Sequence, residues 1–268
     1  MVIFHGLSAL ALAVFLAGVI GRVRFWLSAA DGAPAGEPPA EPLRRQAWAA
    51  ARFLFRPQTL RVLFWNGLAM RQVWRESRLR WLVHLTIAWS FAGLFAVGSL
   101  GNFVADFGVP LEKDDAWFAA FNDAAALALL AGLGLALVRR YLVPPRHART
   151  VLEDGVVLAF LALLAVSGLF VEAGRLLDEG ATASTSGYAF LGYPLSQALE
   201  PLEWDWGLAG DWLWWTHAVA SLGLVAYLPY SKLLHMFTSP VTIALGGDDG
   251  TPAEAEGRAR PEAKPWPA

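Results

Sequence analysis

Cysteine is absent from the 268 residues of this chain. Without a thiolate, the chain can form no disulfide, no cysteine-ligated zinc site and no iron–sulfur cluster of its own. A redox cofactor on this chain would therefore be held by histidine or methionine. Any iron–sulfur cluster in its electron path would belong to a partner protein.

Charge is scarce as well. Only 16% of the residues are Asp, Glu, Lys or Arg, whereas soluble domains carry about a quarter. Hydrophobic residues make up 56% of the chain, and several apolar runs reach the roughly 20 residues that span a bilayer as a helix. The composition excludes an ordinary soluble enzyme and predicts an all-α membrane protein with several spans.

Five apolar runs predict a bundle of five transmembrane helices. Charges follow the first run, at Arg22 and Arg24, instead of preceding it, which favours an uncleaved span over a signal peptide. All five runs belong to one predicted membrane domain, 1–245, and the Pro/Ala/Glu-rich residues 246–268 are predicted to be a disordered tail. The predicted spans are about 2–20, 81–103, 116–138, 155–172 and 212–237.

The connection between the first two spans, loop 21–80, is long and contains two kinds of sequence. Its Pro/Ala/Gly-rich part, 28–43, reads as a linker. The rest mixes arginine with Trp, Phe and Leu, which predicts amphipathic helices on the cytoplasmic membrane surface, broken at Pro57. Residues 173–210 are expected to form a second long loop.

Positive charge is divided unevenly among the loops. Of the 21 Lys and Arg residues, eleven lie in loop 21–80, four in 139–150 and four from Ser231 onward. The two remaining loops hold only Lys113 and Arg175. Because loops rich in Lys and Arg stay in the cytoplasm, this pattern predicts an outside N-terminus and a cytoplasmic C-terminus.

The fifth predicted span carries a histidine near each end, His217 and His235, eighteen residues apart. Eighteen residues complete five helical turns, so both imidazoles would leave the same face of one helix. They would lie roughly 27 Å apart along the axis, close to the thickness of the hydrocarbon core. This spacing suits an electron path through two haems, one near each side of the membrane.

Two further histidines lie at matching depths. His84 is four residues into the second span, which starts on the cytoplasmic side, and His5 is near the outer end of the first span. A b-type haem with two axial imidazoles needs one histidine from each of two facing helices. The depths pair His84 with His235 as iron ligands of an inner haem, and His5 with His217 as ligands of an outer haem.

Each of these four histidines, taken alone, is equally consistent with a structural role inside the bundle. The fifth, His147, lies among arginines of a predicted cytoplasmic loop and is interpreted as a solvated surface residue. Small residues beside the predicted ligands, such as Gly6 and Gly93, suit a flat macrocycle or ordinary helix packing. Three cations are candidate partners of haem propionates or ordinary cytoplasmic charge: Arg78, Arg80 and Lys232.

The end of the fifth span resembles the last helix of the respiratory nitrate reductase gamma subunit family. That family has two haem-ligating histidines at this spacing, and its second histidine stands within a Pro-aromatic-Ser-basic-Leu-x-His ending that a later proline follows. The corresponding residues here are Pro229, Tyr230, Ser231, Lys232, Leu233, Leu234, His235 and Pro240. The five-span topology also agrees with this family.

One departure separates this chain from the nitrate reductase pattern. The family carries two histidines ten residues apart in its second span, whereas here His84 is followed ten residues later by Leu94. The resemblance therefore implies His84 and His235 as the inner ligands and His217 as one outer ligand, and His5 is assigned from depth alone. The missing histidine and the arginine-rich approach to His84 resemble the branch associated with heterodisulfide reductase and sulfite reduction.

The resemblance implies a membrane cytochrome b that transfers electrons between quinone, either menaquinone or ubiquinone, and a cytoplasmic iron–sulfur subunit of an oxidoreductase complex. We expect two haem b groups, the inner (cytoplasmic) membrane of a prokaryote as its location, and no nucleic-acid partner. Two other classes stay open. One is a haem-free membrane anchor for a cytoplasmic redox enzyme, and the other is a small proton-coupled transporter, although no inverted repeat supports it.

Overall fold

Helices form all the regular structure in the computed structural model, which describes residues 2–30, 52, 55–100, 115–143, 152–235 and 238–239. The chain divides into two units. The larger holds residues 1–40 and 72–234, and the smaller holds residues 41–71 and 235–268. The predicted tail, 246–268, lies outside the described residues, so the predicted domain boundary at residue 245 stays a prediction.

Within the described residues, four helices are long and apolar enough to cross a membrane: Val2–Arg24, Arg78–Val97, Ala116–Leu142 and Asp154–Asp178. They coincide with the first four predicted spans and confirm the class of a helical, multi-pass membrane protein. The first belongs to α1 (Val2–Ala30). The others are α5 (Arg78–Gly93) with the π-helical η2 (Leu94–Leu100), α7 (Ala116–Leu137) with the π-helical η3 (Val138–Leu142), and α8 (Leu152–Asp178).

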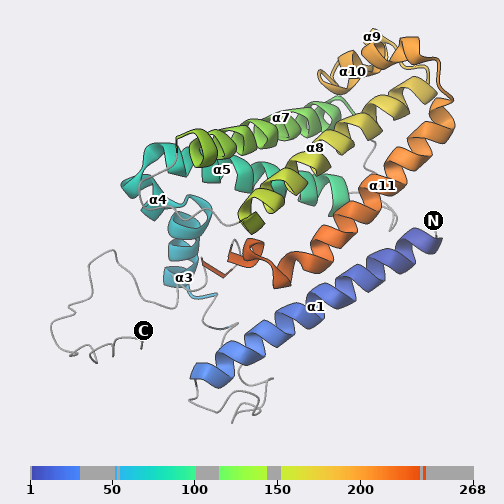
Figure 1. Ribbon diagram of the computed structural model, residues 1–268. Coiled ribbons are helices and arrows are strands. Elements are labelled where there is room, and N and C mark those ends of the chain that lie inside the picture. The colour runs from blue at the N-terminus through green and yellow to red at the C-terminus, as the bar shows by residue number, and fades with distance from the viewer. Residues whose placement is uncertain are drawn as a thin grey trace. The chain divides into compact units, whose positions relative to one another are not determined.

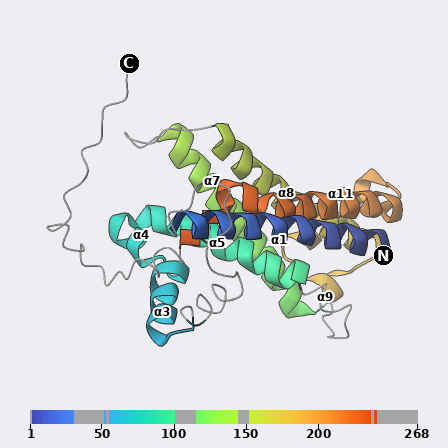
Figure 2. The same ribbon diagram turned by 90° about the horizontal axis from the view of Figure 1, so that it is seen from below.

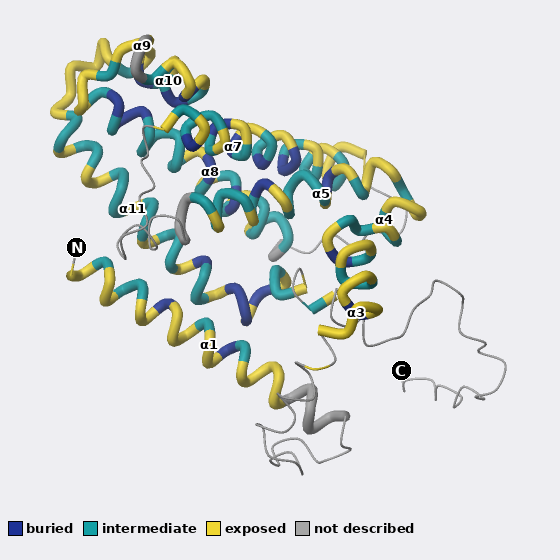
Figure 3. Tube along the Cα trace, turned by 180° about the vertical axis from the view of Figure 1, so that it is seen from behind, coloured by how far each residue is buried: buried dark blue, intermediate teal, exposed yellow. Residues whose placement is uncertain are grey.

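The helices of the larger unit pack in a chain of neighbours. α5 packs on α7, α7 on α8, α8 on α11 (Trp206–Tyr227), and α11 on α1 (Figure 1). A core of Leu129 and Leu133 from α7, Leu161 and Ala165 from α8 and Leu224 from α11 joins three of them. In Figure 3 the buried positions concentrate on α7 and α8, while α1 is mostly exposed along its length. In Figure 2, seen from below, α1 runs alongside α11.

Local sequence explains where two of these helices begin. Ser77 has an extended backbone, and its hydroxyl accepts a hydrogen bond from the Arg80 backbone nitrogen at 3.3 Å, which caps α5. Asp205 caps α11 in the same way, because its carboxylate accepts from the Leu208 nitrogen at 3.1 Å. α11 therefore starts six residues before the predicted span.

The predicted fifth span is not one continuous helix. α11 ends at Tyr227, and two short 3₁₀ turns follow, η5 (Leu228–Tyr230) and η6 (Lys232–Leu234), separated by Ser231 in an extended conformation. Pro229 lacks the backbone N–H that an α-helix needs at this position. The prediction of one helix over 212–237 with His217 and His235 on one stripe is therefore wrong.

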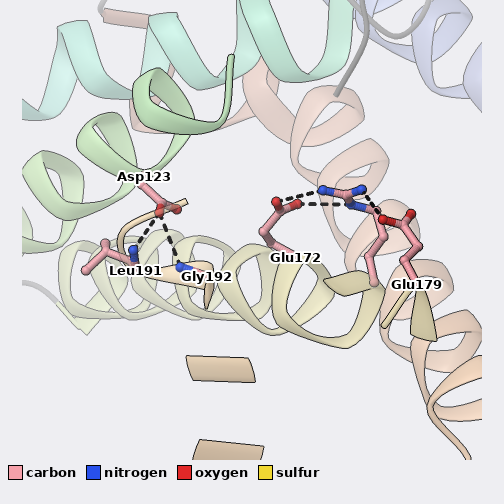
Figure 4. A network of polar contacts seen from close by, with 6 residues as sticks. Asp123, Glu172, Glu179, Leu191 and Gly192 are labelled. Atoms are coloured by element: carbon pink, nitrogen blue, oxygen red, sulfur yellow. Dashed lines mark hydrogen bonds and ion pairs between the residues drawn. The ribbon is translucent and has the colours of Figure 1, made fainter. Parts of the chain in front are cut away.

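The region 173–210 is largely helical and not the irregular loop expected from the sequence. α8 continues to Asp178, and α9 (Ala183–Ser186), α10 (Gly192–Leu199) and the 3₁₀ turn η4 (Glu200–Leu202) follow. α10 packs on α8. The extension of α8 is explained by Arg175, which forms ion pairs with Glu172 at 3.0 Å and Glu179 at 2.7 Å along one helix face (Figure 4).

The smaller unit contains α3 (Pro57–Val62) and the π-helical η1 (Leu63–Leu68). Pro57 is the first residue of α3, because its fixed φ suits the first helical turn, where no N–H partner is needed. A helix therefore begins where the sequence predicts a break between helices. Four large apolar side chains of this segment are exposed, together with Arg61: Leu60, Phe64, Trp65 and Leu68. The following helix, α4 (Arg71–Glu76), belongs to the larger unit from residue 72 onward. Its Trp74 packs edge-on against Trp81, with 4.6 Å between the ring centroids.

Candidate functional site

His84 lies in the second turn of α5 with an exposed side chain. Its Nδ1 is 2.9 Å from the backbone carbonyl oxygen of Arg80, one turn earlier. A carbonyl can only accept a hydrogen bond, so Nδ1 carries the hydrogen and Nε2 carries the lone pair. An imidazole held by Nδ1–H to a carbonyl is the arrangement in which histidine binds a metal through Nε2.

His217 is also held through Nδ1. The ring is half-buried in α11, and Nδ1 lies 2.8 Å from the hydroxyl oxygen of Ser167 on α8. The neighbouring residue of α8 is Gly168, where a Cβ would come within 3.3 Å of the His217 Cε1 atom. His217, the predicted outer ligand on α11, therefore packs against two small residues of α8, Ser167 and Gly168.

The structure leaves both predicted pairings untested. His235 is the first residue after η6, has an exposed side chain and belongs to the smaller unit, so the pair of His84 with His235 stays a prediction. His5 is exposed at the end of the first turn of α1. The adjacent Phe4 lies 5.2 Å, ring to ring, from Trp214, which is one turn before His217 on α11. This contact sets His5 and His217 at a similar level, as the predicted outer pair requires.

Leu94, where the nitrate reductase pattern has its second histidine, is half-buried and packs against the apolar core of α7, α8 and α11. The π-helical turn η2 also starts at this residue. The position is therefore occupied by an ordinary packing residue. The remaining histidine, His147, lies outside the described residues.

Other residues that the sequence placed near a cofactor have protein neighbours. Arg80 pairs with Glu76 at 2.6 Å and Lys232 with Asp154 at 2.9 Å. The guanidinium of Arg78 lies over the Trp74 ring at 5.3 Å. Gly93 faces α7, since a Cβ there would lie 2.9 Å from the Phe121 ring, so its small size serves helix packing.

Two polar residues of the bundle were missed by sequence reasoning. Ser167 carries no signal beyond a hydroxyl in an apolar run. Asp123, a carboxylate within the third apolar run, is 1% exposed and accepts hydrogen bonds from the backbone nitrogens of Leu191 and Gly192 at 2.6 and 3.2 Å (Figure 4). A buried acid in a spanning segment is costly unless it is paired, and that cost was the available signal.

Across the part of the chain that the structure describes, no group of three or more His, Asp or Glu side chains gathers in a way that could hold a metal ion. A haem takes its four equatorial ligands from the macrocycle and needs only two axial ligands from the protein. The donor chemistry at His84 fits such an axial ligand, because its hydrogen is on Nδ1 and its lone pair is on Nε2.

Comparison with known proteins decides the family. The family model described as nitrate reductase gamma subunit matches residues 72–245. The chain belongs to the nitrate reductase gamma subunit family. The matched region includes His84, His217 and His235, whereas His5 lies before it, so His5 has no support from this match.

Curated relatives point to one branch of the family. The chain is 27% identical over 262 residues to a subunit of the dihydromethanophenazine:CoB–CoM heterodisulfide reductase of Methanosarcina acetivorans, with 88% of each chain covered. The corresponding protein of Methanosarcina mazei is 26% identical over 253 residues, covering 88% of this chain and 90% of the relative. These relatives confirm the resemblance to the heterodisulfide reductase branch. No solved structure matches the chain with significance.

Proposed function

We propose that this protein is the b-type cytochrome membrane subunit of an oxidoreductase complex, and that it passes electrons between the quinone pool and a cytoplasmic iron–sulfur subunit. The observation that carries the proposal is the orientation of His84. Its Nδ1 is held by the Arg80 carbonyl at 2.9 Å, which leaves Nε2 as the nitrogen with the ligating lone pair. The family match, which includes His84, supports the same assignment.

His84 and His235 would hold an inner haem b, and His217 and His5 an outer one. A bis-histidine haem has no open iron position and exchanges single electrons without binding a substrate. The protein supplies the imidazoles, and it sets the orientation of two of them, His84 and His217, through Nδ1.

The membrane arrangement completes the proposal. α11 would be the fifth crossing, because its 22 residues extend over roughly 33 Å and pack along α8 and α1. The charge asymmetry supports an outside N-terminus and arginine-rich loops in the cytoplasm, and the protein would lie in the inner membrane of a prokaryote. The exposed apolar side chains of α3 and η1 would rest on the cytoplasmic lipid surface.

The electron carriers are proposed by class. The relatives are named for a reductase of the CoB–CoM heterodisulfide that uses dihydromethanophenazine. By analogy, a reduced membrane carrier such as menaquinol or ubiquinol would deliver electrons here, and a cytoplasmic iron–sulfur subunit would receive them. Because this chain has no cysteine, any such cluster must lie on the partner.

The test is a dithionite-reduced minus oxidised spectrum of the purified full-length protein, with haem quantified per chain. We expect a b-type α-band and two haems. His84→Ala and His217→Ala should each remove one haem, while His147→Ala should keep both. A wild-type protein without a b-type spectrum, isolated from haem-sufficient cells, would exclude the cytochrome and favour a haem-free anchor.

A further inference from the structure

The hydrogen bond between Ser167 and His217 has a direction that the neighbouring carbonyl decides. The Ser167 Oγ atom lies 2.8 Å from Nδ1 of His217 and 3.0 Å from the backbone oxygen of Leu164, three residues earlier in α8. A serine hydroxyl has one hydrogen and two lone pairs. The Leu164 carbonyl can only accept, so the hydroxyl hydrogen points to that carbonyl.

The lone pairs of the Ser167 oxygen are then what faces the imidazole. For the 2.8 Å contact to be a hydrogen bond, Nδ1 of His217 must supply the hydrogen. In this assignment both contacts of the hydroxyl are hydrogen bonds, since it donates to the Leu164 carbonyl and accepts from His217. The contacts of Ser167 therefore place the His217 hydrogen on Nδ1 and the lone pair on Nε2.

The backbone of α8 beside Ser167 supports the same ring position. At Gly168, the nearest neighbour of a built Cβ is the His217 Cε1 atom at 3.3 Å, followed by Nδ1 and Nε2 at 3.9 Å each. The imidazole thus lies close to the helix surface at a residue with no side chain. A branched side chain at position 168 would push the ring away from the Ser167 hydroxyl.

We propose that Ser167 is the positioning residue of His217: its hydroxyl, oriented by the Leu164 carbonyl, holds the imidazole in the tautomer that offers Nε2 to a haem iron, and Gly168 makes room for the ring. This inference rests on the proposed cytochrome function. An acceptor at Nδ1–H also raises the basicity of the ligating nitrogen, which stabilises the ferric state. Loss of the hydroxyl should therefore raise the midpoint potential of the haem that His217 ligates.

The experiment compares Ser167→Ala with Ser167→Thr in the full-length, haem-loaded protein. Threonine keeps a hydroxyl that can bond the same preceding-turn carbonyl. Potentiometric titration and low-temperature electron paramagnetic resonance would follow each haem separately. We expect Ser167→Ala to raise the potential and shift the low-spin signal of one haem, the one that His217→Ala removes. The haem that His84 ligates should be unchanged, and Ser167→Thr should resemble the wild type.

Gly168→Val gives a second route if Ser167→Ala fails to accumulate. It should perturb the same haem, while Gly134→Val on α7, where a built Cβ meets nothing within 4 Å, should perturb neither. The proposal is overturned if Ser167→Ala leaves both potentials and both signals unchanged, or if Ser167→Thr shifts them as much as alanine does. A wild type without haem would instead overturn the proposed function itself.

Discussion

The carboxylate of Asp123 on α7 accepts a hydrogen bond from the backbone nitrogen of Leu191, 2.6 Å away and 68 residues later in the chain. The same oxygen accepts from Gly192 at 3.2 Å, at the first residue of α10. Glu172 of α8 approaches from the other side, since a Cβ at Gly192 would lie 2.7 Å from its Cγ atom (Figure 4). One buried acid thus fastens the α9–α10 segment to the bundle.

Replacing Asp123 with alanine should loosen this segment. Each of the two backbone N–H groups left without an acceptor costs about 1–3 kcal/mol. At about 2–4 °C per kcal/mol for a large chain, we expect Tm of the purified protein to fall by at least about 4 °C. Asp123→Asn should lose less, because both hydrogen bonds reach a single oxygen that an amide can supply. Hydrogen exchange at Leu191 and Gly192 should accelerate in the alanine variant. Unchanged exchange there would contradict the fastening role.

α1 should detach from η5 when Gly18 is enlarged. A Cβ at Gly18 would lie 2.7 Å from the Cβ of Pro229 and 2.9 Å from the Tyr230 ring. Gly18→Val should therefore destabilise the protein by about 1–3 kcal/mol, measured as a lower Tm and faster proteolysis of α1. The matched control is Gly21→Val in the same helix, where a built Cβ meets nothing within 4 Å. Equal effects of the two variants would show that valine in α1, and not the contact, is responsible.

Asp154 should matter more for stability than Lys232 does. The carboxylate binds Arg140 through one oxygen and Lys232 through the other, at 2.9 Å, which ties η3 and η6 to the start of α8. Lys232 is half-exposed, so Lys232→Ala should cost less than about 1 kcal/mol. Asp154→Ala should cost about 1.5–3 kcal/mol, because the Arg140 guanidinium loses a charged acceptor. The Nε atom of Arg140 is already buried without a hydrogen-bond partner in the described part of the chain. Thermal melts at low and high salt would compare the stabilities of the Asp154→Ala and Lys232→Ala variants. Equal losses would exclude this ranking.

The predicted outer pair, His5 on α1 and His217 on α11, would ligate the same haem. His5→Ala and His217→Ala should remove the same haem, identified by its midpoint potential and its low-spin signal, and should leave the other unchanged. The Phe4–Trp214 contact at 5.2 Å places the two histidines at a similar level, which is the reason for expecting a shared cofactor. If His5→Ala retains two haems per chain, the ligand opposite His217 lies elsewhere, and the assignment of His5 is wrong.

Four of the predicted spans could be predicted because apolar length alone marks a membrane crossing, and the described helices coincide with those runs. Helix ends were less predictable. α8 runs past its apolar segment because Glu172, Arg175 and Glu179 neutralise one another at helical spacing. The sequence signal for the break after Tyr227 is Pro229, whereas the eighteen-residue spacing of the histidines favours one continuous helix.

The candidate site, like the fold, could be predicted only in part from the sequence. Histidine depth and family pattern singled out His84 and His217, and the structure adds how each ring is held. The partners that orient the rings, the Arg80 carbonyl and the Ser167 hydroxyl, leave no compositional trace, because any residue has a carbonyl and serine is common in apolar helices. Contacts between helices distant in the sequence, such as Ser167 with His217, depend on how α8 and α11 pack.

The break at Pro229 makes the orientation of His235 independent of the orientation of His217, whereas one continuous helix would fix the angle between them. In an unbroken helix, inserting one residue anywhere between His217 and His235 would rotate one histidine by about 100° relative to the other. Here Arg22 donates a hydrogen bond to the Pro229 carbonyl at 3.3 Å, and the Lys232–Asp154 pair holds η6, so the segment after Tyr227 is anchored independently of α11. A change of length near residues 228–231 would therefore leave the register of α11, and with it the orientation of His217, unchanged.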